Sequence, residues 1–266
     1  MPETPPIVLS IAGFDPSSGA GVTADIKTIA ALGCYGVSAI TALTVQSTAG
    51  VRRVVPVEPE LLTDSLEELT RDVKVSAVHI GMLGNQGIAA AVAEFISRAR
   101  LRNVVLDPIL VSSSGARLLD DGGLQVLTGQ LLPLADVITP NIDEAAALTG
   151  REVKNPEQMT AAAERLHEMG SKAVVITGGH LDPAIDVLSI RGQASQVFRA
   201  DRLGSANTHG TGCAFSTAIA CYMALDCPLS TAVSRAKNYV FEAIRNSYSI
   251  GKGPGPVNHM HEPKKG

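Results

Sequence analysis

The chain lacks the features that mark several classes of protein. Of its 266 residues only 3% are aromatic and none is Trp, whereas 45% are hydrophobic. Its formal net charge of -4 comes without a basic block, which argues against nucleic acid or an anionic membrane surface as a partner. No uninterrupted apolar run approaches membrane-spanning length. What remains is a composition rich in Ala, Val, Leu and Ile, which is typical of buried strands between helices of small residues.

Cysteines are few and widely spaced. Cys34, Cys213, Cys221 and Cys227 form neither a C-x-x-C pair nor a close Cys/His cluster, so zinc and disulfide frameworks are not supported and reduced thiols are expected. The first residues, M-P-E-T-P-P, carry an acid and prolines where a secretory signal would carry a basic region. We therefore expect a cytoplasmic protein.

Short apolar runs alternate with longer segments of helical period along the whole chain. This alternation predicts one α/β domain over 1–266, with a mostly parallel sheet covered by helices on both faces. Segments 1–6 and 250–266 are expected to be tails. Strands are expected to begin at 7, 37, 77 and 103, with others over 136–141 and 173–179, a hairpin over 185–198, and helices over 19–32, 60–71, 87–100, 118–131, 160–169, 212–225 and 230–247.

Ligands of such sheets gather at the carboxyl ends of the strands, and a glycine-rich loop follows the first predicted strand there. This loop, A-G-F-D-P-S-S-G-A-G, lacks both the P-loop lysine and the G-x-G-x-x-G spacing. It is therefore either a ligand-binding loop or an ordinary strand-to-helix turn. Asp25, one helical turn later, has two interpretations as well: a carboxylate directed at a ligand, or a first-turn acid that complements the helix dipole.

Two later strand ends carry acids. Asp107 ends one predicted strand, and Asn141-x-x-Glu144 follows another. Such a set can hold Mg²⁺ through its water molecules. The alternative is that Asn141 caps the following helix and Glu144 completes a capping pattern. Met82, between glycines at a strand end, is either a core residue or part of a pocket wall.

The segment T-H-G-T-G-C-A over 208–214 opens into an apolar run and predicts a tight loop that feeds a helix. The free N–H groups of a helix start attract anions and lower the pKa of a thiol, so Cys213 is expected to have a depressed pKa. The alternative is a structural turn with a small buried thiol. His209 is either a phosphate donor or a structural hydrogen-bonding residue. An anion loop, an acidic cradle and a nucleophile or base at one edge are what phosphoryl transfer requires.

Seven segments resemble, in order and over nearly the whole chain, the hydroxymethylpyrimidine/phosphomethylpyrimidine kinase family of thiamine biosynthesis, which has the ribokinase-like fold. The cysteine of N-T-H-G-T-G-C, where sugar kinases of this fold carry aspartate, is typical of the vitamin-kinase branch. The other segments are A-G-F-D-P-S-S-G-A-G-V-T-A-D-I-K-T, A-I-T-A-L-T-V-Q-S-T, I-G-M-L-G, V-V-L-D-P, I-T-P-N-I-D-E-A and G-G-H.

The resemblance implies a cytoplasmic enzyme that uses ATP and Mg²⁺ on a small-molecule substrate, and dimerisation is common in this fold. It implies that Cys213 is catalytic, near the substrate hydroxymethyl group, and that Mg²⁺ is held by Asp107 and Glu144 through water. The implied anion hole is Gly210, Thr211, Gly212 and Cys213; the implied substrate site is Gly13, Ala20, Asp25, Gln46 and Met82; and the implied nucleotide site is Asp107, Asn141, Glu144, Thr177, Thr208 and His209.

Two positions depart from the family pattern. Ser18-Gly19 stands where the family often has G-G, and Thr177 stands where it often has a lysine that contacts phosphate. A pyridoxal or pyridoxine kinase of the same branch is the alternative, because those vitamins also present a hydroxymethyl group on a six-membered nitrogen ring. A catalytically weak pyrimidine-binding protein is the third interpretation, and Thr177 is its only support.

Overall fold

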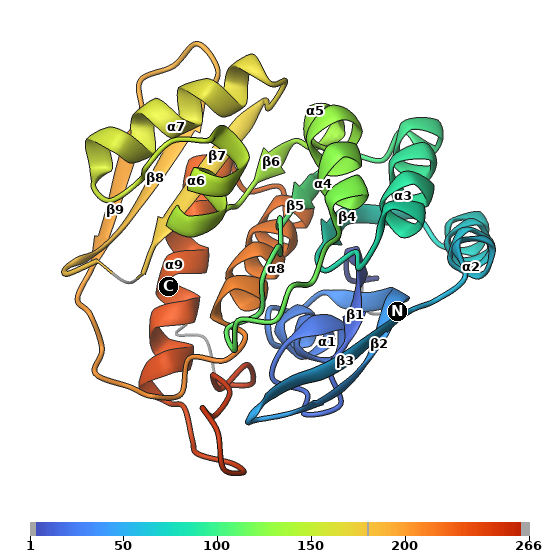
Figure 1. The fold of residues 1–266 in the computed structure, drawn as a ribbon, viewed down its shortest axis with the longest axis horizontal. Coiled ribbons are helices and arrows are strands. Elements are labelled where there is room, and N and C mark those ends of the chain that lie inside the picture. The colour runs from blue at the N-terminus through green and yellow to red at the C-terminus, as the bar shows by residue number, and fades with distance from the viewer. Residues whose placement is uncertain (1–3, 180, 262–266) are drawn as a thin grey trace.

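The computed structural model describes residues 4–179 and 181–261. Within them, one sheet of nine strands has the order β3-β2-β1-β4-β5-β6-β7-β8-β9 (Figure 1). The strands are β1 (Ile7–Phe14), β2 (Tyr35–Ser47), β3 (Gly50–Pro56), β4 (Val75–Ile80), β5 (Val104–Leu106), β6 (Val137–Ile138), β7 (Ala173–Gly178), β8 (Ala184–Ile190) and β9 (Gln196–Ala200). The helices are α1 (Gly21–Ala31), α2 (Pro59–Asp72), α3 (Gln86–Ala99), α4 (Asp121–Val126), the π-helical turn η1 (Leu127–Leu131), α5 (Leu132–Leu134), α6 (Ile142–Thr149), α7 (Pro156–Glu168), α8 (Thr211–Ala224) and α9 (Leu229–Arg245).

The sheet is parallel at its centre and antiparallel at its ends. β2, β1, β4, β5, β6 and β7 pair in parallel, whereas β3, β8 and β9 join as antiparallel neighbours. The predicted mostly parallel α/β sheet is therefore confirmed. Because parallel strands end at the same edge, the loops after β1, β4, β5, β6 and β7 meet along one side of the molecule.

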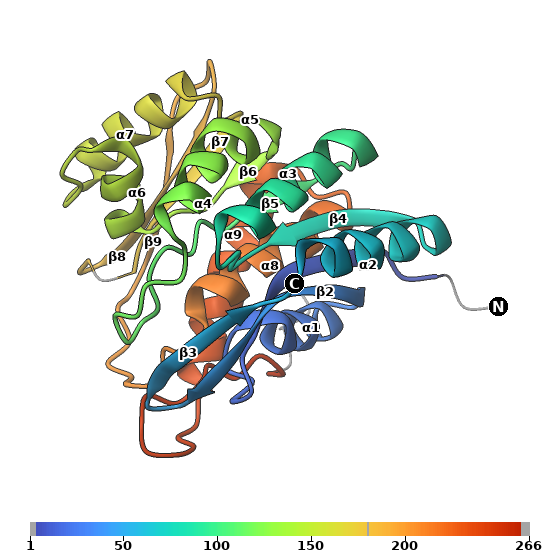
Figure 2. The same cartoon turned by 45° about the vertical axis from the view of Figure 1, so that its right-hand side comes forward.

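Helices cover both faces of this sheet, and each face has its own core. One core contains the small residues of α8, with Ala214, Ala218 and Cys221 fully or almost fully buried against α9 and the strands. The other core joins the strands to α2, α3 and the helices up to α7. Figure 2 shows α1, α8 and α9 on one side of the sheet and α3 to α7 on the other. The alanine-rich sequence of α8 lets this helix lie close to the strands, which places its first turn at the strand ends.

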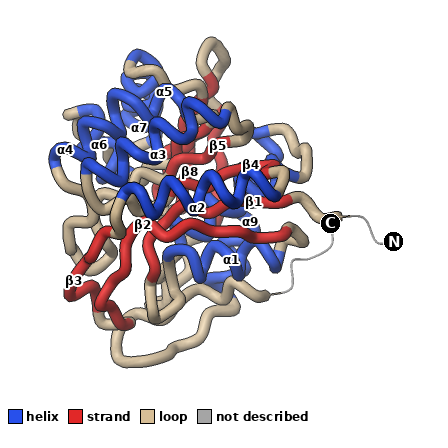
Figure 3. The backbone as a smooth tube through the Cα atoms, turned by 90° about the vertical axis from the view of Figure 1, so that its right-hand side faces the viewer, coloured by secondary structure: helices blue, strands red, loops and turns tan. Residues whose placement is uncertain are grey.

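The ribbon of β2 and β3 is a feature that the sequence analysis only half predicted, since it expected a strand from 37 but none over 50–56. Its outer face bears exposed Leu43, Val45 and Val55, with Leu43 opposite Val55 in register. Beneath it, Ala42, Met82 and Leu118 form a separate small apolar cluster. Figure 3 shows the ribbon at the edge of the molecule. The helix expected from 118 begins instead at Asp121, because the Asp120 side chain accepts from Gly123 N–H and caps it there.

The described helices include none with the length and apolarity needed to cross a bilayer.

Candidate active site at the carboxyl ends of the strands

The first turn of α8 forms an open anion loop. Gly210, the N-cap residue, has φ 84°, and the N–H of Thr211 donates to the Thr208 carbonyl. The first N–H groups of a helix have no intrahelical acceptor, so those of Gly212 and Cys213 face outward with the positive end of the helix dipole. The loop predicted over 208–214 therefore has the geometry that an anion needs.

Gly210 and Gly212 are glycines for different reasons. A Cβ at Gly210 would lie 1.8 Å from the Gly19 carbonyl oxygen, so the two glycine-rich loops touch backbone to backbone there. A Cβ at Gly212 would meet only one atom within 4 Å, the Oδ2 of Asp107 at 3.9 Å. Gly210 thus joins the loops, whereas Gly212 leaves space beside the Asp107 carboxylate.

Cys213 is 8% exposed, and its thiol lies at the start of α1, where the N–H of Gly21 donates to it. Burial raises the pKa of Cys213 well above its usual value, and the charges of Asp107 and Asp25 raise it further. The hydrogen bond from Gly21 acts in the opposite direction but does not prevail. The expected depression of this pKa is therefore wrong, because nearby carboxylates and desolvation outweigh the helix dipole.

Asp15 joins the first loop to the second, and the sequence analysis did not single it out. Its carboxylate accepts from the N–H of Ser17 at 2.8 Å, the N–H of Ala20 at 3.0 Å and the Nε2 of His209 at 2.9 Å. Burial alone would raise the pKa of Asp15, but the hydrogen bonds from His209 and Ser17 outweigh it and the pKa lies below its usual value. The D-P-S-S sequence carried a turn signal for this residue.

His209 lies over the first loop, beside the ribbon. A Cβ at Gly19 would approach the His209 ring to 2.2 Å, and the Nε2 of Gln46 lies 3.4 Å from the His209 Nε2. Because the Asp15 carboxylate requires a donor, the Nε2 of His209 carries a proton. His209 is thus placed with Gln46 and Asp15 at the first loop.

Met82, Gly13 and Ala20 stand close to this group. The Cε of Met82 would lie 2.8 Å from a Cβ at Gly13, so the methionine covers the end of β1. The carbonyl of Met82 accepts from Thr41 Oγ1, which fixes its backbone. Ala20 is held by Asp15 through its N–H. The structure therefore brings four of the five expected substrate residues, Gly13, Ala20, Gln46 and Met82, to one place between the first loop and the ribbon.

The fifth, Asp25, lies beneath them. Its side chain is completely buried, and its two oxygens accept from Ser10 Oγ at 2.6 Å and Thr217 Oγ1 at 2.9 Å, with His79 Nδ1 at 3.1 Å. A contact between Asp25 and a ring would require some of these hydrogen bonds to be exchanged. That contact stays a prediction.

Asp107, Asn141 and Glu144 lie at adjacent strand ends on the far side of Cys213. Asn141 and Glu144 form a full capping box, so the alternative structural interpretation of this pair is confirmed. Burial raises the pKa of Glu144 to about 8, and repulsion from Asp107 adds to it. Burial also raises the pKa of Asp107 to about 6. Two buried acids without a basic partner between them are suited to a cation, so the metal-binding interpretation stays open beside the cap.

Thr177 lies next to Asn141, where β6 and β7 end. The two residues form a parallel bridge, and the Thr177 N–H donates to the Pro140 carbonyl. Opposite Thr177 in register is Asp186, whose carboxylate accepts from Lys237 Nζ at 2.7 Å. A lysine is thus present near the position where the family pattern has one, on α9 and paired to an acid. His180 of the G-G-H segment lies outside the described residues.

The C-terminal segment supports the anion loop from behind. The N–H of His209 donates to the Gly255 carbonyl, and the N–H of Val257 donates to the His209 carbonyl. Val257 is fully buried, and Tyr239 Oη donates to the His259 carbonyl at 2.6 Å. Within the segment expected to be a tail, most of residues 255–261 are thus packed into the protein next to the anion loop.

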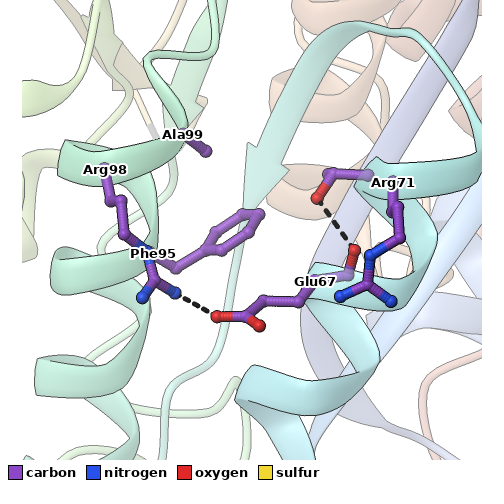
Figure 4. A pocket seen from close by; sticks show the side chains of 6 residues that line it. Glu67, Arg71, Phe95, Arg98 and Ala99 are labelled. Atoms are coloured by element: carbon purple, nitrogen blue, oxygen red, sulfur yellow. Dashed lines mark hydrogen bonds and ion pairs between the residues drawn. The ribbon is translucent and has the colours of Figure 1, made fainter.

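A surface hollow of about 270 Å³ lies elsewhere, between the last turns of α2 and α3. Its walls include Phe95 and the ion pair between Arg98 and Glu67 (Figure 4). The C-terminal ends of these helices face the amino ends of the strands, so this hollow is at the edge opposite to Cys213. It is not part of the site.

Comparison with known proteins agrees with this geometry. The phosphomethylpyrimidine kinase family model matches residues 15–258. A thiamine biosynthesis bifunctional protein of Geobacter sulfurreducens is 45% identical over 95% of this chain, which spans 52% of that longer protein. The hydroxymethylpyrimidine/phosphomethylpyrimidine kinase of Aquifex aeolicus is 41% identical, over 93% of this chain and 97% of its own length.

Two solved structures extend the comparison. Phosphomethylpyrimidine kinase from Clostridium difficile has a TM-score of 0.80 at 37% identity and covers 90% of this chain and 99% of its own. Pyridoxal kinase from Staphylococcus aureus, in complex with AMP-PCP and pyridoxal, has a TM-score of 0.89 at 30% identity. The match covers 98% of this chain and 96% of the pyridoxal kinase. The predicted ribokinase-like fold is confirmed. With a family model that matches residues 15–258 and relatives above 40% identity, the chain belongs to the phosphomethylpyrimidine kinase family.

Proposed function

We propose that the protein transfers the γ-phosphoryl group of ATP to 4-amino-5-hydroxymethyl-2-methylpyrimidine and then to its monophosphate, in thiamine biosynthesis. The observation that carries the proposal is the open anion loop at Gly212 and Cys213, between the acids at Asp107 and Glu144 and the cluster around Gln46 and Met82. A phosphoryl donor and an acceptor can therefore approach the same loop from opposite sides.

The acceptor ring is assigned to the space between the first loop and the ribbon. The Met82 side chain and its apolar cluster supply a wall for a flat ring, and the Gln46 amide supplies a donor and an acceptor for amino and ring-nitrogen groups. Because Gly13 and Ala20 have small side chains or none, their backbone can come close to the ring. The expected contact between Asp25 and the ring would complete the substrate site. The ring's hydroxymethyl group then points at Cys213.

In the transfer, the hydroxymethyl oxygen attacks the γ-phosphorus, the bond from that phosphorus to the bridging oxygen breaks, and ADP leaves. The N–H groups of Gly212 and Cys213 stabilise charge on the phosphoryl oxygens. The Cys213 thiol is protonated at rest, because its pKa is raised. When a cation offsets the charge of Asp107 and Glu144, the pKa of Cys213 falls and its proton passes to solvent. The resulting thiolate orients the hydroxyl group and accepts its proton.

A divalent cation fits the acid pair. Asp107 and Glu144 provide hard oxygen donors whose pKa values are raised by burial, with the charge of Asp107 adding to the effect at Glu144, and Glu144 is held in place by the N–H of Asn141. Among residues 4–179 and 181–261, no group of three or more His, Cys, Asp or Glu side chains is arranged to hold a metal alone. We assign Asp107 and Glu144, through water, to Mg²⁺, which would add positive charge at the phosphates. Asn141, Thr177 and Thr208 border the nucleotide on this side.

We also propose a cytoplasmic homodimer. The outer face of the ribbon exposes Leu43, Val45 and Val55, and β3 is an edge strand with a free side. An apolar face beside an unpaired strand edge favours contact with another copy of the chain. Sedimentation of wild type and of Leu43→Glu tests this: a dimer that dissociates in the variant supports it, and a wild-type monomer rejects it.

Pyridoxal kinase activity has less support as an alternative. The pyrimidine kinase relatives are 41% and 45% identical to this chain, whereas the pyridoxal kinase from Staphylococcus aureus is 30% identical. The test is ADP release from Mg-ATP with hydroxymethylpyrimidine, its monophosphate, pyridoxal or pyridoxine as acceptor. Turnover of both pyrimidines is expected. Turnover of pyridoxal or pyridoxine alone would assign the site to the alternative, and ligand-induced stabilisation without any ADP release would favour a binding protein.

A further inference from the structure

A buried polar network lies directly below the anion loop, and the proposed function above uses only one of its members, Asp25. Its centre is Asp25 on α1, which accepts from Ser10 on β1, His79 on β4 and Thr217 on α8. All four side chains are fully buried. One carboxylate therefore ties together four elements that meet under the site.

The link to the reaction runs along α8. Thr217 is four residues after Cys213, so the two side chains lie on the same face of the helix, one turn apart. Thr217 Oγ1 donates to Asp25 Oδ1 at 2.9 Å. A change in the position of Asp25 would release this hydroxyl and allow α8 to rotate or shift. Because displacements of about 1 Å can cost about 10²-fold in rate, the orientation of this turn matters for phosphoryl transfer.

His79 is the member that determines where Asp25 lies. Its Nδ1 is 3.1 Å from Asp25 Oδ2 and 3.2 Å from Thr217 Oγ1. Its Nε2 is buried and has no hydrogen-bond partner among the described residues. A buried nitrogen without a partner lowers the free energy of unfolding. Stability alone would thus favour an apolar side chain at position 79. We therefore ask what the imidazole ring contributes through its contact with Asp25.

We propose that His79 is a positioning residue for the phosphoryl transfer assigned above. It orients the Asp25 carboxylate, and Asp25 in turn holds Thr217 and the turn of α8 that begins at Cys213. This inference rests on the proposed function and adds a residue that acts on it from below the site.

Charge supports the same conclusion. Although burial lowers the pKa of His79, the charge of Asp25 and its hydrogen bond outweigh that effect, and Asp107 adds to them, so the pKa is raised. The groups of the network that face His79 are Asp25 from α1, Asp107 after β5 and the hydroxyls of Ser10 and Thr217; the Cys213 thiol on α8 experiences the same two acids. A protonated His79 offsets their charge. Its contribution is complete below about pH 6.5 and is lost as pH rises through the raised pKa.

Three variants test the proposal. His79→Gln keeps a polar side chain without charge, and His79→Lys restores a cation beside Asp25, whose usual pKa is well above that of histidine. His167→Gln is the matched control, because His167 bonds to Ser171 and Ser189 on the other face of the sheet. We expect His79→Gln to lower kcat on hydroxymethylpyrimidine by at least about tenfold, with KM for ATP changed by less than about threefold. His79→Lys should recover most of kcat and keep it at high pH, where wild type declines.

A second readout needs no turnover. The rate at which iodoacetamide alkylates Cys213, followed by mass spectrometry of its peptide, should fall in His79→Gln and recover in His79→Lys, while His167→Gln matches wild type. Wild-type kcat and alkylation in a folded His79→Gln would overturn the proposal, as would a folded His79→Lys no better than His79→Gln. If wild type phosphorylates neither pyrimidine, the proposed function fails, and the alkylation rates still decide whether His79 positions Cys213.

Discussion

At the amino-end edge of the sheet the ion pair of Arg98 and Glu67 is exposed, whereas at the carboxyl-end edge Asp107 and Glu144 are buried and neither forms an ion pair with a basic side chain among the described residues. Arg98 and Glu67 face each other across the hollow between α2 and α3, with 56% and 38% of their side chains exposed. At the other edge, Asp107 and Glu144 are buried; burial raises both pKa values, and the charge of Asp107 raises that of Glu144 further. Both edges thus carry ionisable groups, but only the carboxyl-end edge holds acids that burial keeps from ionising fully.

This difference explains which edge can perform chemistry. An exposed ion pair is solvated and contributes little, so it neither perturbs a pKa nor attracts a ligand strongly. Buried acids beside the free N–H groups of α8 create a strong local field, which a cation and a phosphate can both satisfy. The hollow at the amino-end edge lacks this field.

The largest expected effect follows from removing the thiol at the charged edge. Cys213→Ala should lower kcat on hydroxymethylpyrimidine by about 10²- to 10⁴-fold, because the hydroxyl loses its proton acceptor. The monophosphate is already anionic, so the second transfer depends more on the anion loop and should fall less. Steady-state ADP release with each acceptor measures both steps. Loss of the second step with the first intact would contradict this assignment.

A methyl group at Gly212 should separate activity from stability. Gly212→Ala places its Cβ 3.9 Å from Asp107, in space that the free protein leaves open, so folding should be unaffected while kcat falls by about 10²-fold. Gly210→Ala is the contrasting variant: with φ 84° and Gly19 at 1.8 Å from its Cβ, it should lose at least about 2 kcal/mol of unfolding free energy. Thermal unfolding and turnover of both variants test this, and equal destabilisation by both would contradict it.

Sequence patterns predicted the loops of the site better than its electrostatics. The glycines of T-H-G-T-G-C were sufficient to predict a loop and a helix start, because turn and cap chemistry are local. The direction of the Cys213 pKa was predicted wrongly, since it depends on Asp107 and Asp25 from distant parts of the chain. His79 gave only the signal of a histidine within a buried strand.

Elements were missed where local signals were weak. β3 carries Arg52 and Arg53 in a short strand and pairs only with β2, so its sequence shows no clear apolar pattern. Asp15 joins both loops of the site, but its partner His209 is far away in the sequence. At Asn141 and Glu144 the pattern fitted a helix cap and a metal cradle equally well. The cap is present, and the same two residues stand where a cradle would be.

The raised pKa of Glu144 should also make stability depend on pH. Its pKa of about 8 in the folded protein exceeds the unfolded value of 4.5, so the folded state binds the proton more tightly and the unfolding free energy falls as pH rises from about 5 to 8. Glu144→Gln keeps the capping acceptor and should flatten this decline by about 2–4 kcal/mol. The control is Asp143→Asn, an exposed acid in the same turn. Denaturant unfolding at about pH 5 and about pH 8 measures this loss of unfolding free energy. An equal loss in wild type and in Glu144→Gln would contradict the prediction.

The smallest effect is expected at the amino-end edge. Arg98→Ala removes the exposed pair with Glu67 and should change the unfolding free energy by no more than about 1 kcal/mol, because solvent screens both charges. Turnover of both pyrimidines should stay at the wild-type level, since the hollow lies across the sheet from Cys213. Glu67→Ala should behave in the same way, and the double variant should differ little from either single one. A loss of activity in Arg98→Ala without a loss of stability would show that the two edges are coupled, and the contrast between them would then have to be abandoned.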